Sequence, residues 1–297
     1  MTPTFDAEQT AALLPYPQLV QALRRAVAEL ADGAILCPAR QVEPLQDGAL
    51  LLSMVATARD IAVHKLISVV PNNPARGLPT ISGRVSVVDA VDGTVRLVLD
   101  GATVTGRRTA ALSMLGVEVL LGRAPRHVLI VGAGTQAANH AQALSELYPQ
   151  ARLSVAARSA EAAAHFCARF PFAAPALLSE PAPDADLVIT CTTSRQPVYL
   201  HPAQAGRLVI AVGAFKPDAA EIGADTVRAS RVFVDDPHGA RHEAGDLLLA
   251  GVDWAGVQGI AAALAARPMA DTEAVLFKTV GCAAWDLAAA RTALARS

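Results

Sequence analysis

The sequence predicts an α/β protein of two domains, one built on a mainly antiparallel sheet with helices and one on a parallel sheet with helices on both faces. In the first hundred residues, apolar runs flank two Asp-Gly pairs, which is typical of antiparallel hairpins because both residues tolerate a positive φ. Beyond residue 122, short and nearly continuous apolar runs alternate with helical or mixed segments, as in parallel sheets. A chain of 297 residues, 53% of them hydrophobic, is long enough for two packed domains.

Two helices enclose the expected antiparallel sheet along the chain. The first is predicted over residues 15–31, where Leu19, Leu23 and Leu30 recur on one face. The second is predicted over residues 105–121 and ends at Gly122. Between them we expect strands over residues 41–45, 49–55, 61–70, 84–90 and 94–99.

The boundary between the two domains is placed at residue 122. The first domain is expected to span residues 1–122, the second residues 123–278, and an Ala-rich helix over residues 279–297 is expected to return to the first. In the second domain we expect strands over residues 128–131, 152–156, 187–191, 208–212 and 232–235. The stretch over residues 171–183, rich in Pro and Ala, is interpreted as a loop.

The most informative motif covers residues 126–147. A buried apolar strand runs into Gly132 and Gly134, and an Ala-rich amphipathic helix follows. Gly132 permits the tight turn, Gly134 lets the backbone approach a pyrophosphate, and Ala137 is small enough for contact between helix and strand. With strand before, helix after and more strands downstream, the motif predicts a Rossmann dinucleotide-binding domain, with an ordinary strand-turn-helix as the alternative.

The end of the next strand bears on which nicotinamide cofactor is used. An acidic residue there favours a free ribose 2′-hydroxyl, whereas arginine favours a 2′-phosphate. This strand is followed by Arg158 and Ser159, and Glu161 lies further along, on the next expected helix. We therefore expect NADP(H) in preference to NAD(H), because arginine forms paired hydrogen bonds with phosphate. The alternative is that Arg158 only stacks on the adenine.

Cations in the first domain are the candidate substrate-binding groups. Lysine is rare in this chain, and Lys65 lies in a very apolar strand, where a compact ammonium can change its pKa on burial. Arg40 precedes the first strand. Arg107 and Arg108 are expected at a helix N-terminus, an unfavourable place for cations unless an anion binds there, with Thr105 adding a hydroxyl. Two solvated surface arginines are the alternative.

Composition excludes several other classes of function. A net charge of −2 with no basic block makes nucleic acid an unexpected partner. The sequence has no apolar run of about 18 residues and no signal pattern at the start, so we expect a cytoplasmic protein without membrane contact. Four scattered cysteines read as reduced core residues. We expect no metal, because His238 and His242 lack a third ligand and Gly239 between them suggests a loop.

Taken together, these motifs resemble the ornithine cyclodeaminase/mu-crystallin family over nearly the whole chain. The matching segments are residues 64–83, 91–111, 131–137, 212–222, 243–248 and 277–290. The resemblance implies an α+β substrate and dimerisation domain beside the Rossmann domain. It also implies a homodimer whose substrate-domain sheets assemble across the interface.

The resemblance assigns roles to individual residues of this chain. Arg40, Lys65 and Arg108 match the family's substrate-carboxylate and catalytic cations, and Thr80 is expected in the substrate pocket. The cofactor positions that the resemblance implies are Thr105, Gly132, Gly134, Thr135, Gln136, Arg158, Ser159, Thr192, Val212 and Lys278.

One departure from the family pattern points to the reaction. True ornithine cyclodeaminases carry Asp in the segment Val-Gly-Gly-Asp-x-Pro-Gly-Lys, where this chain has Phe215, and a phenyl ring can neither hold an ammonium by charge nor transfer its proton. The resemblance is then closer to the ketimine reductases. It implies NADPH-dependent reduction of Δ1-pyrroline-2-carboxylate or Δ1-piperideine-2-carboxylate to L-proline or L-pipecolate, with Phe215 lining the substrate pocket. The alternatives are an ornithine cyclodeaminase, a related NAD-dependent amino-acid dehydrogenase, or a non-catalytic crystallin-like binding protein.

Overall fold

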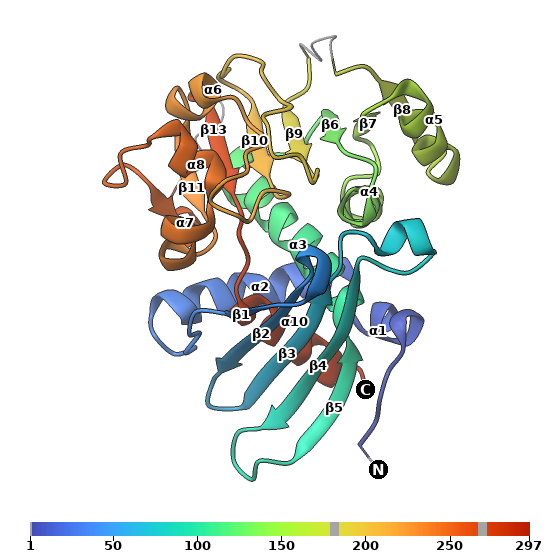
Figure 1. Ribbon diagram of the computed structural model, residues 1–297. Helices are drawn as coiled ribbons and strands as arrows, with labels where there is room; N and C mark the ends of the chain where they lie inside the picture. The colour runs from blue at the N-terminus through green and yellow to red at the C-terminus, as the bar shows by residue number, and fades with distance from the viewer. Residues whose placement is uncertain (1, 179–183, 267–271) are drawn as a thin grey trace. The chain divides into compact units, whose positions relative to one another are not determined.

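The computed structural model describes residues 2–178, 184–266 and 272–297, which form two compact units (Figure 1). The first unit combines residues 1–112 with residues 282–297, and the second comprises residues 113–281. The division falls inside the helix that precedes the boundary expected at residue 122, and the C-terminal segment is part of the first unit.

The first unit is built on a five-stranded antiparallel sheet whose strands follow chain order, which confirms the predicted fold class for this part. The strands are β1 (Gln41–Pro44), β2 (Leu50–Thr57), β3 (Ile61–Val69), β4 (Ile81–Asp89) and β5 (Val95–Asp100). Asp47 and Gly48 have φ values of 56° and 74° in the turn between β1 and β2, as the Asp-Gly pattern requires. The other elements of this unit's N-terminal part are α1 (Ala7–Leu13), α2 (Tyr16–Ala31), η1 (Gln46–Gly48) and η2 (Asn73–Arg76).

A C-terminal helix, α10 (Ala283–Leu294), packs against β2, β3 and α2 (Figure 1). It begins later than the predicted start at residue 279, because Gly281 has a φ of 78° and Cys282 is extended. Burial alternates along β3, so one face of the sheet is covered while the other is more exposed.

The helix predicted to start at Thr105 starts earlier. α3 spans Gly101–Gly116, continues as the π-helical turn η3 (Val117–Leu121) and ends at Gly122, which has a φ of 71°. The early start has a local cause, since the Asp100 carboxylate accepts the Thr103 backbone N–H at 2.9 Å and the Thr103 hydroxyl at 2.8 Å. Arg107 and Arg108 therefore lie in the second turn, and the expectation that they stand at the helix N-terminus is wrong.

The second unit contains an eight-stranded sheet in which every pairing is parallel, as predicted for a Rossmann-like domain. Its strand order is β12-β11-β13-β10-β9-β6-β7-β8. The strands are β6 (His127–Val131), β7 (Arg152–Ala156), β8 (Ala173–Ala176), β9 (Leu187–Thr190), β10 (Leu208–Ala211), β11 (Arg231–Val234), β12 (Gln258–Gly259) and β13 (Val275–Lys278). The helices that accompany them are α4 (Thr135–Leu147), α5 (Ala160–Arg169), α6 (Ala224–Arg228), α7 (Pro237–Glu243), α8 (Gly245–Ala250) and α9 (Ile260–Leu264).

Three strands of this sheet, β8, β12 and β13, were not predicted. The loop interpretation of residues 171–183 is wrong at β8, an edge strand whose middle residues are exposed and which therefore lacks an apolar run; residues 179–183 of that stretch lie outside the described residues. β13 is fully buried, but it is short and ends in a lysine, which obscures its apolar pattern. Gly239 lies inside α7, so the expected loop there is also wrong.

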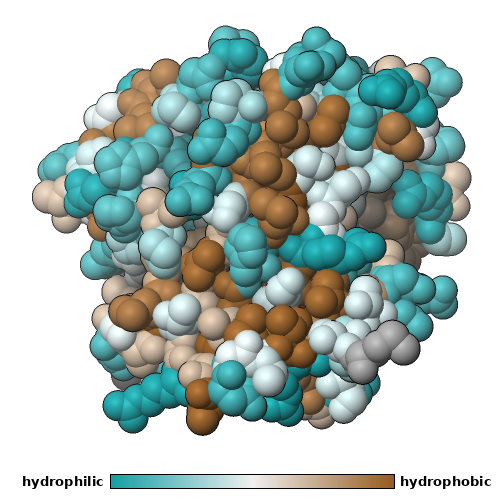
Figure 2. Space-filling model, turned by 60° about the horizontal axis from the view of Figure 1, so that its bottom comes forward, coloured by the Kyte–Doolittle hydropathy of each residue, from teal (hydrophilic) through white to brown (hydrophobic). Residues whose placement is uncertain are grey.

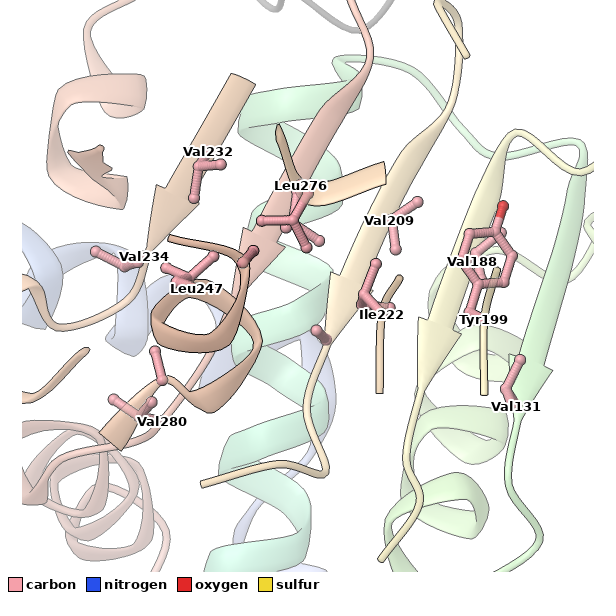
Figure 3. Close-up of a cluster of buried hydrophobic side chains, with 14 of the residues drawn as sticks. Val131, Val188, Tyr199, Val209, Ile222, Val232, Val234, Leu247, Leu276 and Val280 are labelled. Atoms are coloured by element: carbon pink, nitrogen blue, oxygen red, sulfur yellow. The ribbon is translucent and has the colours of Figure 1, made fainter. Parts of the chain in front are cut away.

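Side chains on one face of the parallel sheet form a continuous hydrophobic cluster (Figure 3). Val131, Val188, Val209 and Leu276 come from four different strands, and Leu247 of α8 packs onto them. Each buried aliphatic side chain of this kind contributes about 1.5–3 kcal/mol to stability. The cluster thereby fixes the strands whose carboxyl ends carry the expected cofactor residues.

The described part of the chain contains neither a membrane-spanning helix nor a cluster of metal-binding side chains. Among these residues no helix combines the length and the apolar character needed to cross a membrane. No group of three or more His, Cys, Asp or Glu in the described part of the chain is arranged to hold a metal ion. In the described part of the chain, Cys37, Cys167, Cys191 and Cys282 form no disulfide bond.

Candidate active site

The first unit contains a buried cluster of two cations around one carboxylate. Lys65, in the middle of β3, is 1% exposed and its Nζ lies 2.7 Å from Oδ2 of Asp286 in the first turn of α10. Arg108 of α3 places its Nε 3.3 Å from the other oxygen of the same carboxylate. Asp286 carries one negative charge against two cations, so these three groups together keep one positive charge inside the protein.

The protonation of Lys65 is finely balanced. Burial lowers its pKa to about 8, and the positive charges of Arg108 and Arg40 act in the same direction, while Asp286 raises it. Arg40 is half-buried just before β1 and is close enough to Lys65 to influence it. The structure thus brings Arg40, Lys65 and Arg108, which the sequence analysis singled out, into one electrostatic neighbourhood.

Arg107 lies apart from this cluster. Its Nε donates to the Leu14 carbonyl at 2.7 Å, and its guanidinium lies 4.0 Å above the centre of the Tyr16 ring. It is neither an anion ligand at a helix N-terminus nor a solvated surface residue. It ties α3 to the start of α2 through a hydrogen bond and a cation–π contact.

The two threonines expected near the site have local partners. Thr105 is buried in α3, and its hydroxyl donates to the Gly101 carbonyl at 2.8 Å. Thr80 is half-buried before β4, where its carbonyl accepts the Val70 backbone N–H at 2.8 Å. The position of Thr80 in the loop before β4 is what relates it to the expected substrate pocket.

In the second unit, the glycine turn has the geometry of a pyrophosphate socket. Gly132 has a φ of 126°, and a Cβ there would lie 2.7 Å from the Cys191 carbonyl oxygen, so only glycine fits. Gly134 precedes the first turn of α4, and a Cβ there would meet nothing within 4 Å. Thr135 opens α4 and is exposed, while Gln136 keeps its Oε1 buried without a hydrogen-bond partner among the described residues. Free backbone N–H groups at a helix N-terminus suit a phosphate, and the space above Gly134 admits one.

Arg158 and Ser159 occupy the turn between β7 and α5. Arg158 is exposed, and the Ser159 hydroxyl oxygen accepts the Ala162 backbone N–H at 3.2 Å as the N-cap of α5. As a cap, the hydroxyl still has its own hydrogen to donate. Together with the start of α5, these two residues could hold a ribose 2′-phosphate.

A buried carboxylate that the sequence analysis missed organises the loops after β9 and β10. Glu221 accepts the Thr190 hydroxyl at 3.0 Å and the backbone N–H groups of Thr192 and Gly213 at 2.6 Å each. Burial raises the pKa of Glu221, and the nearby Lys278 ammonium opposes that rise. Since Thr192 and Val212 lie in these loops, Glu221 holds the backbone in place at two of the expected cofactor positions.

Lys278 takes part in the same buried network. Its Nζ lies 2.9 Å from Oδ2 of Asp246 and donates to the Ala211 carbonyl at 3.3 Å, and none of its side chain is exposed. Asp246 in turn accepts the backbone N–H of Glu221 at 2.6 Å. The Lys278 ammonium, which we expected at the cofactor, therefore serves the interior of the second unit. Its signal in the sequence was a lone charge in an apolar segment, a signal that Asp286 shares.

Phe215 lies in the loop after β10, where the family's cyclodeaminases carry their carboxylate. It is half-buried, and the neighbouring Lys216 and Asp218 are exposed. Asp218 forms an ion pair with Arg195 on the surface, so it does not replace the missing carboxylate.

A cavity of about 820 Å³ lies at the amino ends of the parallel strands, around the first residues of β6, β7 and β9. Its cations are already paired, since Arg123 and Arg126 both contact the buried Asp186 carboxylate. Dinucleotides bind at the carboxyl ends of parallel strands, so this cavity is not the expected cofactor site.

Known proteins resemble this chain over nearly its whole length. The model of the ornithine cyclodeaminase/mu-crystallin family matches residues 5–296. The chain is 57% identical to the Delta(1)-pyrroline-2-carboxylate/Delta(1)-piperideine-2-carboxylate reductase of Azospirillum brasilense, over 98% of this chain and 94% of the relative. It is equally similar, at 57% identity and the same coverage, to Delta(1)-pyrroline-2-carboxylate reductase 2 of Burkholderia ambifaria.

A solved structure has the same fold. Delta(1)-pyrroline-2-carboxylate reductase of Thermococcus litoralis, in complex with NADH and L-proline, superposes with a TM-score of 0.89. It covers 98% of this chain and 96% of its own, at 24% identity. From the family model and the near full-length relatives, the chain belongs to the ornithine cyclodeaminase/mu-crystallin family.

Proposed function

We propose that this protein is an NAD(P)H-dependent oxidoreductase that reduces the C=N bond of cyclic ketimine carboxylates. Its substrates would be Δ1-pyrroline-2-carboxylate and Δ1-piperideine-2-carboxylate, and its products L-proline and L-pipecolate. The observation that carries the proposal is the buried pair of Lys65 and Arg108, which holds one positive charge more than Asp286 neutralises. The 57% identity to reductases named for these two imines supports it.

In this proposal the chain's own residues bind and protonate the substrate. Arg108 and Arg40 hold the substrate carboxylate, because guanidinium groups match carboxylates with paired hydrogen bonds. The Lys65 ammonium, with its pKa near 8, supplies a proton to the ring nitrogen. A reduced nicotinamide, when bound, supplies the hydride that the imine carbon takes up. The overall change is one proton and one hydride added across C=N.

Phe215 favours a reductase over a cyclodeaminase. A half-buried phenyl ring offers an apolar wall to the ring carbons of the substrate. It cannot bind the side-chain ammonium of ornithine, which in the cyclodeaminases is handled by an aspartate at this place. Ornithine is therefore expected to be a non-substrate and serves as the control.

We propose NADPH as the preferred reductant in the cytoplasm. The exposed Arg158 and the capping Ser159 offer a charge and a hydroxyl to a 2′-phosphate. Arg158→Ala should weaken NADPH binding about tenfold or more and leave NADH binding nearly unchanged, since only NADPH carries the phosphate. Equal losses for both cofactors would mean that Arg158 stacks on the adenine instead.

We also propose that the protein is a homodimer that pairs the sheets of its first units. The more exposed face of that sheet carries Val55 and Leu66, which are 37% and 43% exposed. On the face drawn in Figure 2, hydrophobic residues gather between hydrophilic ones. Light scattering after gel filtration tests the state, and Leu66→Lys should shift a dimer toward the monomer.

Kinetics with purified protein test the proposed reaction. We expect oxidation of NADPH, followed at 340 nm, with either cyclic imine, and loss of nearly all turnover in Lys65→Gln. An unchanged rate in Lys65→Gln would remove the assigned role of Lys65. Ammonia released from ornithine without net cofactor oxidation would replace the proposal by the cyclodeaminase reaction.

A further inference from the structure

We propose that Asp286 is the positioning residue that keeps Lys65 in its ammonium form and directs it, together with Arg108, toward the substrate. This inference rests on the proposed function and deepens it. Through Asp286, α10 then takes part in supplying the proton, whereas the sequence had predicted only that this helix returns to the first domain.

The geometry gives each carboxylate oxygen its own cation. Oδ2 of Asp286 lies 2.7 Å from the Lys65 ammonium, and Oδ1 lies 3.3 Å from Nε of Arg108. None of the Asp286 side chain is exposed, so both contacts are shielded from water. Asp286 also lies in the first turn of α10, where the helix dipole favours an acidic side chain.

The remaining surroundings of Lys65 oppose its positive charge. The strand neighbours contribute only Met54 from β2 and Val85 from β4, which pair with Lys65 across the sheet. Arg108 from α3 and Arg40 before β1 repel a further cation. Asp286 from α10 is the acidic group that favours the charged form. Burial and both arginines lower the Lys65 pKa to about 8 even with Asp286 present.

The consequence for the reaction concerns where the proton is stored. In the proposed step, Lys65 transfers a proton to the ring nitrogen while the imine carbon accepts a hydride, and the neutral amine then regains a proton from water. Asp286 makes the ammonium the resting state at neutral pH. Without that carboxylate, a fall of about one pH unit would leave about half of the Lys65 side chains neutral at pH 7 before the substrate arrives.

A direct test is available because the chain has only three lysines, Lys65, Lys216 and Lys278. Lysine labelled with ¹³C at Cε gives three NMR signals, and Lys65→Gln assigns one of them. In Asp286→Asn, the titration midpoint of Lys65 should fall by about one pH unit or more, which means a tenfold lower ratio of charged to neutral form at fixed pH. The alkaline limb of kcat/KM should move to lower pH by the same amount.

The chain offers a matched control at its other buried Lys–Asp pair. Asp246 and Lys278 are fully buried and 2.9 Å apart, and Asp246→Asn makes the same chemical change there. This variant should move the Lys278 signal and leave the Lys65 midpoint in place. A shift of Lys65 in both variants would mean a general response to weakened folding and would overturn the proposal.

Two further results separate the possible failures. An unmoved Lys65 midpoint in a folded Asp286→Asn protein overturns the role of Asp286 even if the enzyme reduces cyclic imines. A wild-type protein that oxidises no NADPH overturns the proposed function, and the NMR titration can still be read because it needs no substrate. If Asp286→Asn does not fold, Arg108→Gln removes a repelling cation and should raise the Lys65 midpoint; a fall or no change would contradict the inference.

Discussion

The glycine turn after β6 offers a prediction that separates folding from cofactor binding, because its two glycines are required for different reasons. Gly132 has a φ of 126°, and an added Cβ would lie 2.7 Å from the Cys191 carbonyl oxygen. The backbone strain costs about 1–3 kcal/mol, and the close contact adds about 1–3 kcal/mol. Taking about 3 kcal/mol as a moderate total, Gly132→Ala should lower Tm by about 6–12 °C.

Gly134→Ala should behave in the opposite way. No atom lies within 4 Å of a Cβ at this position, and its φ is −91°, which any residue can adopt. The only folding cost is the poorer N-cap, about 1 kcal/mol at most. If the pyrophosphate lies against this backbone, the methyl group displaces it and NADPH should bind about tenfold more weakly or worse.

Thermal unfolding and titration of NADPH fluorescence measure these two effects on the same samples. A folded Gly134→Ala protein that binds NADPH as tightly as the wild type would refute the placement of the pyrophosphate at this turn. A Gly132→Ala protein as stable as the wild type would refute the argument from packing against Cys191.

Three further predictions concern a buried histidine, a buried Lys–Asp pair and the two neighbouring arginines of α3. Burial lowers the pKa of His140 from 6.5 to about 4, so the unfolded chain takes up the proton first as pH falls, and the free energy of unfolding drops by about 3 kcal/mol. Urea unfolding at about pH 4.5 and about pH 7 should show a smaller loss of stability in His140→Gln than in the wild type. An equal loss in both proteins would contradict the assignment to His140. Lys278→Met leaves Asp246 buried without its cation and should cost about 3–5 kcal/mol in urea unfolding, whereas a loss near zero would mean that the pair relaxes. Arg107→Ala should lose about 1 kcal/mol of stability and keep the KM for the imine unchanged, whereas Arg108→Ala should raise that KM. The reverse pattern would assign substrate binding to Arg107 and the structural contact to Arg108.

The sequence was most informative where a local pattern has one structural solution. Both Asp-Gly pairs lie in the expected hairpins with the glycine at positive φ, 74° at Gly48 and 75° at Gly93. The glycine turn and the apolar runs around it predicted a parallel sheet, which the strand pairings confirm. Lys65 could be singled out because a lysine in an apolar strand needs a partner, but the identity of that partner could not be predicted.

The features that could not be predicted depend on contacts between distant segments or on small shifts of an element. Asp286 meets Lys65 only because α10 returns to the sheet of the first unit, and no local pattern encodes that pairing. Successive helix residues project about 100° apart, so Arg107 and Arg108 meet different neighbours, and which neighbours these are depends on how α3 packs. β8 is an exposed edge strand, so its sequence lacks the apolar run by which the inner strands were recognised.

The most direct test of the central claim is a spectrophotometric assay at 340 nm with purified protein and each cyclic imine acid in turn. We expect NADPH to be consumed with Δ1-pyrroline-2-carboxylate or Δ1-piperideine-2-carboxylate, with one equivalent of L-proline or L-pipecolate formed and no ammonia released from ornithine. A protein that binds NADPH but oxidises it with neither imine would contradict the account.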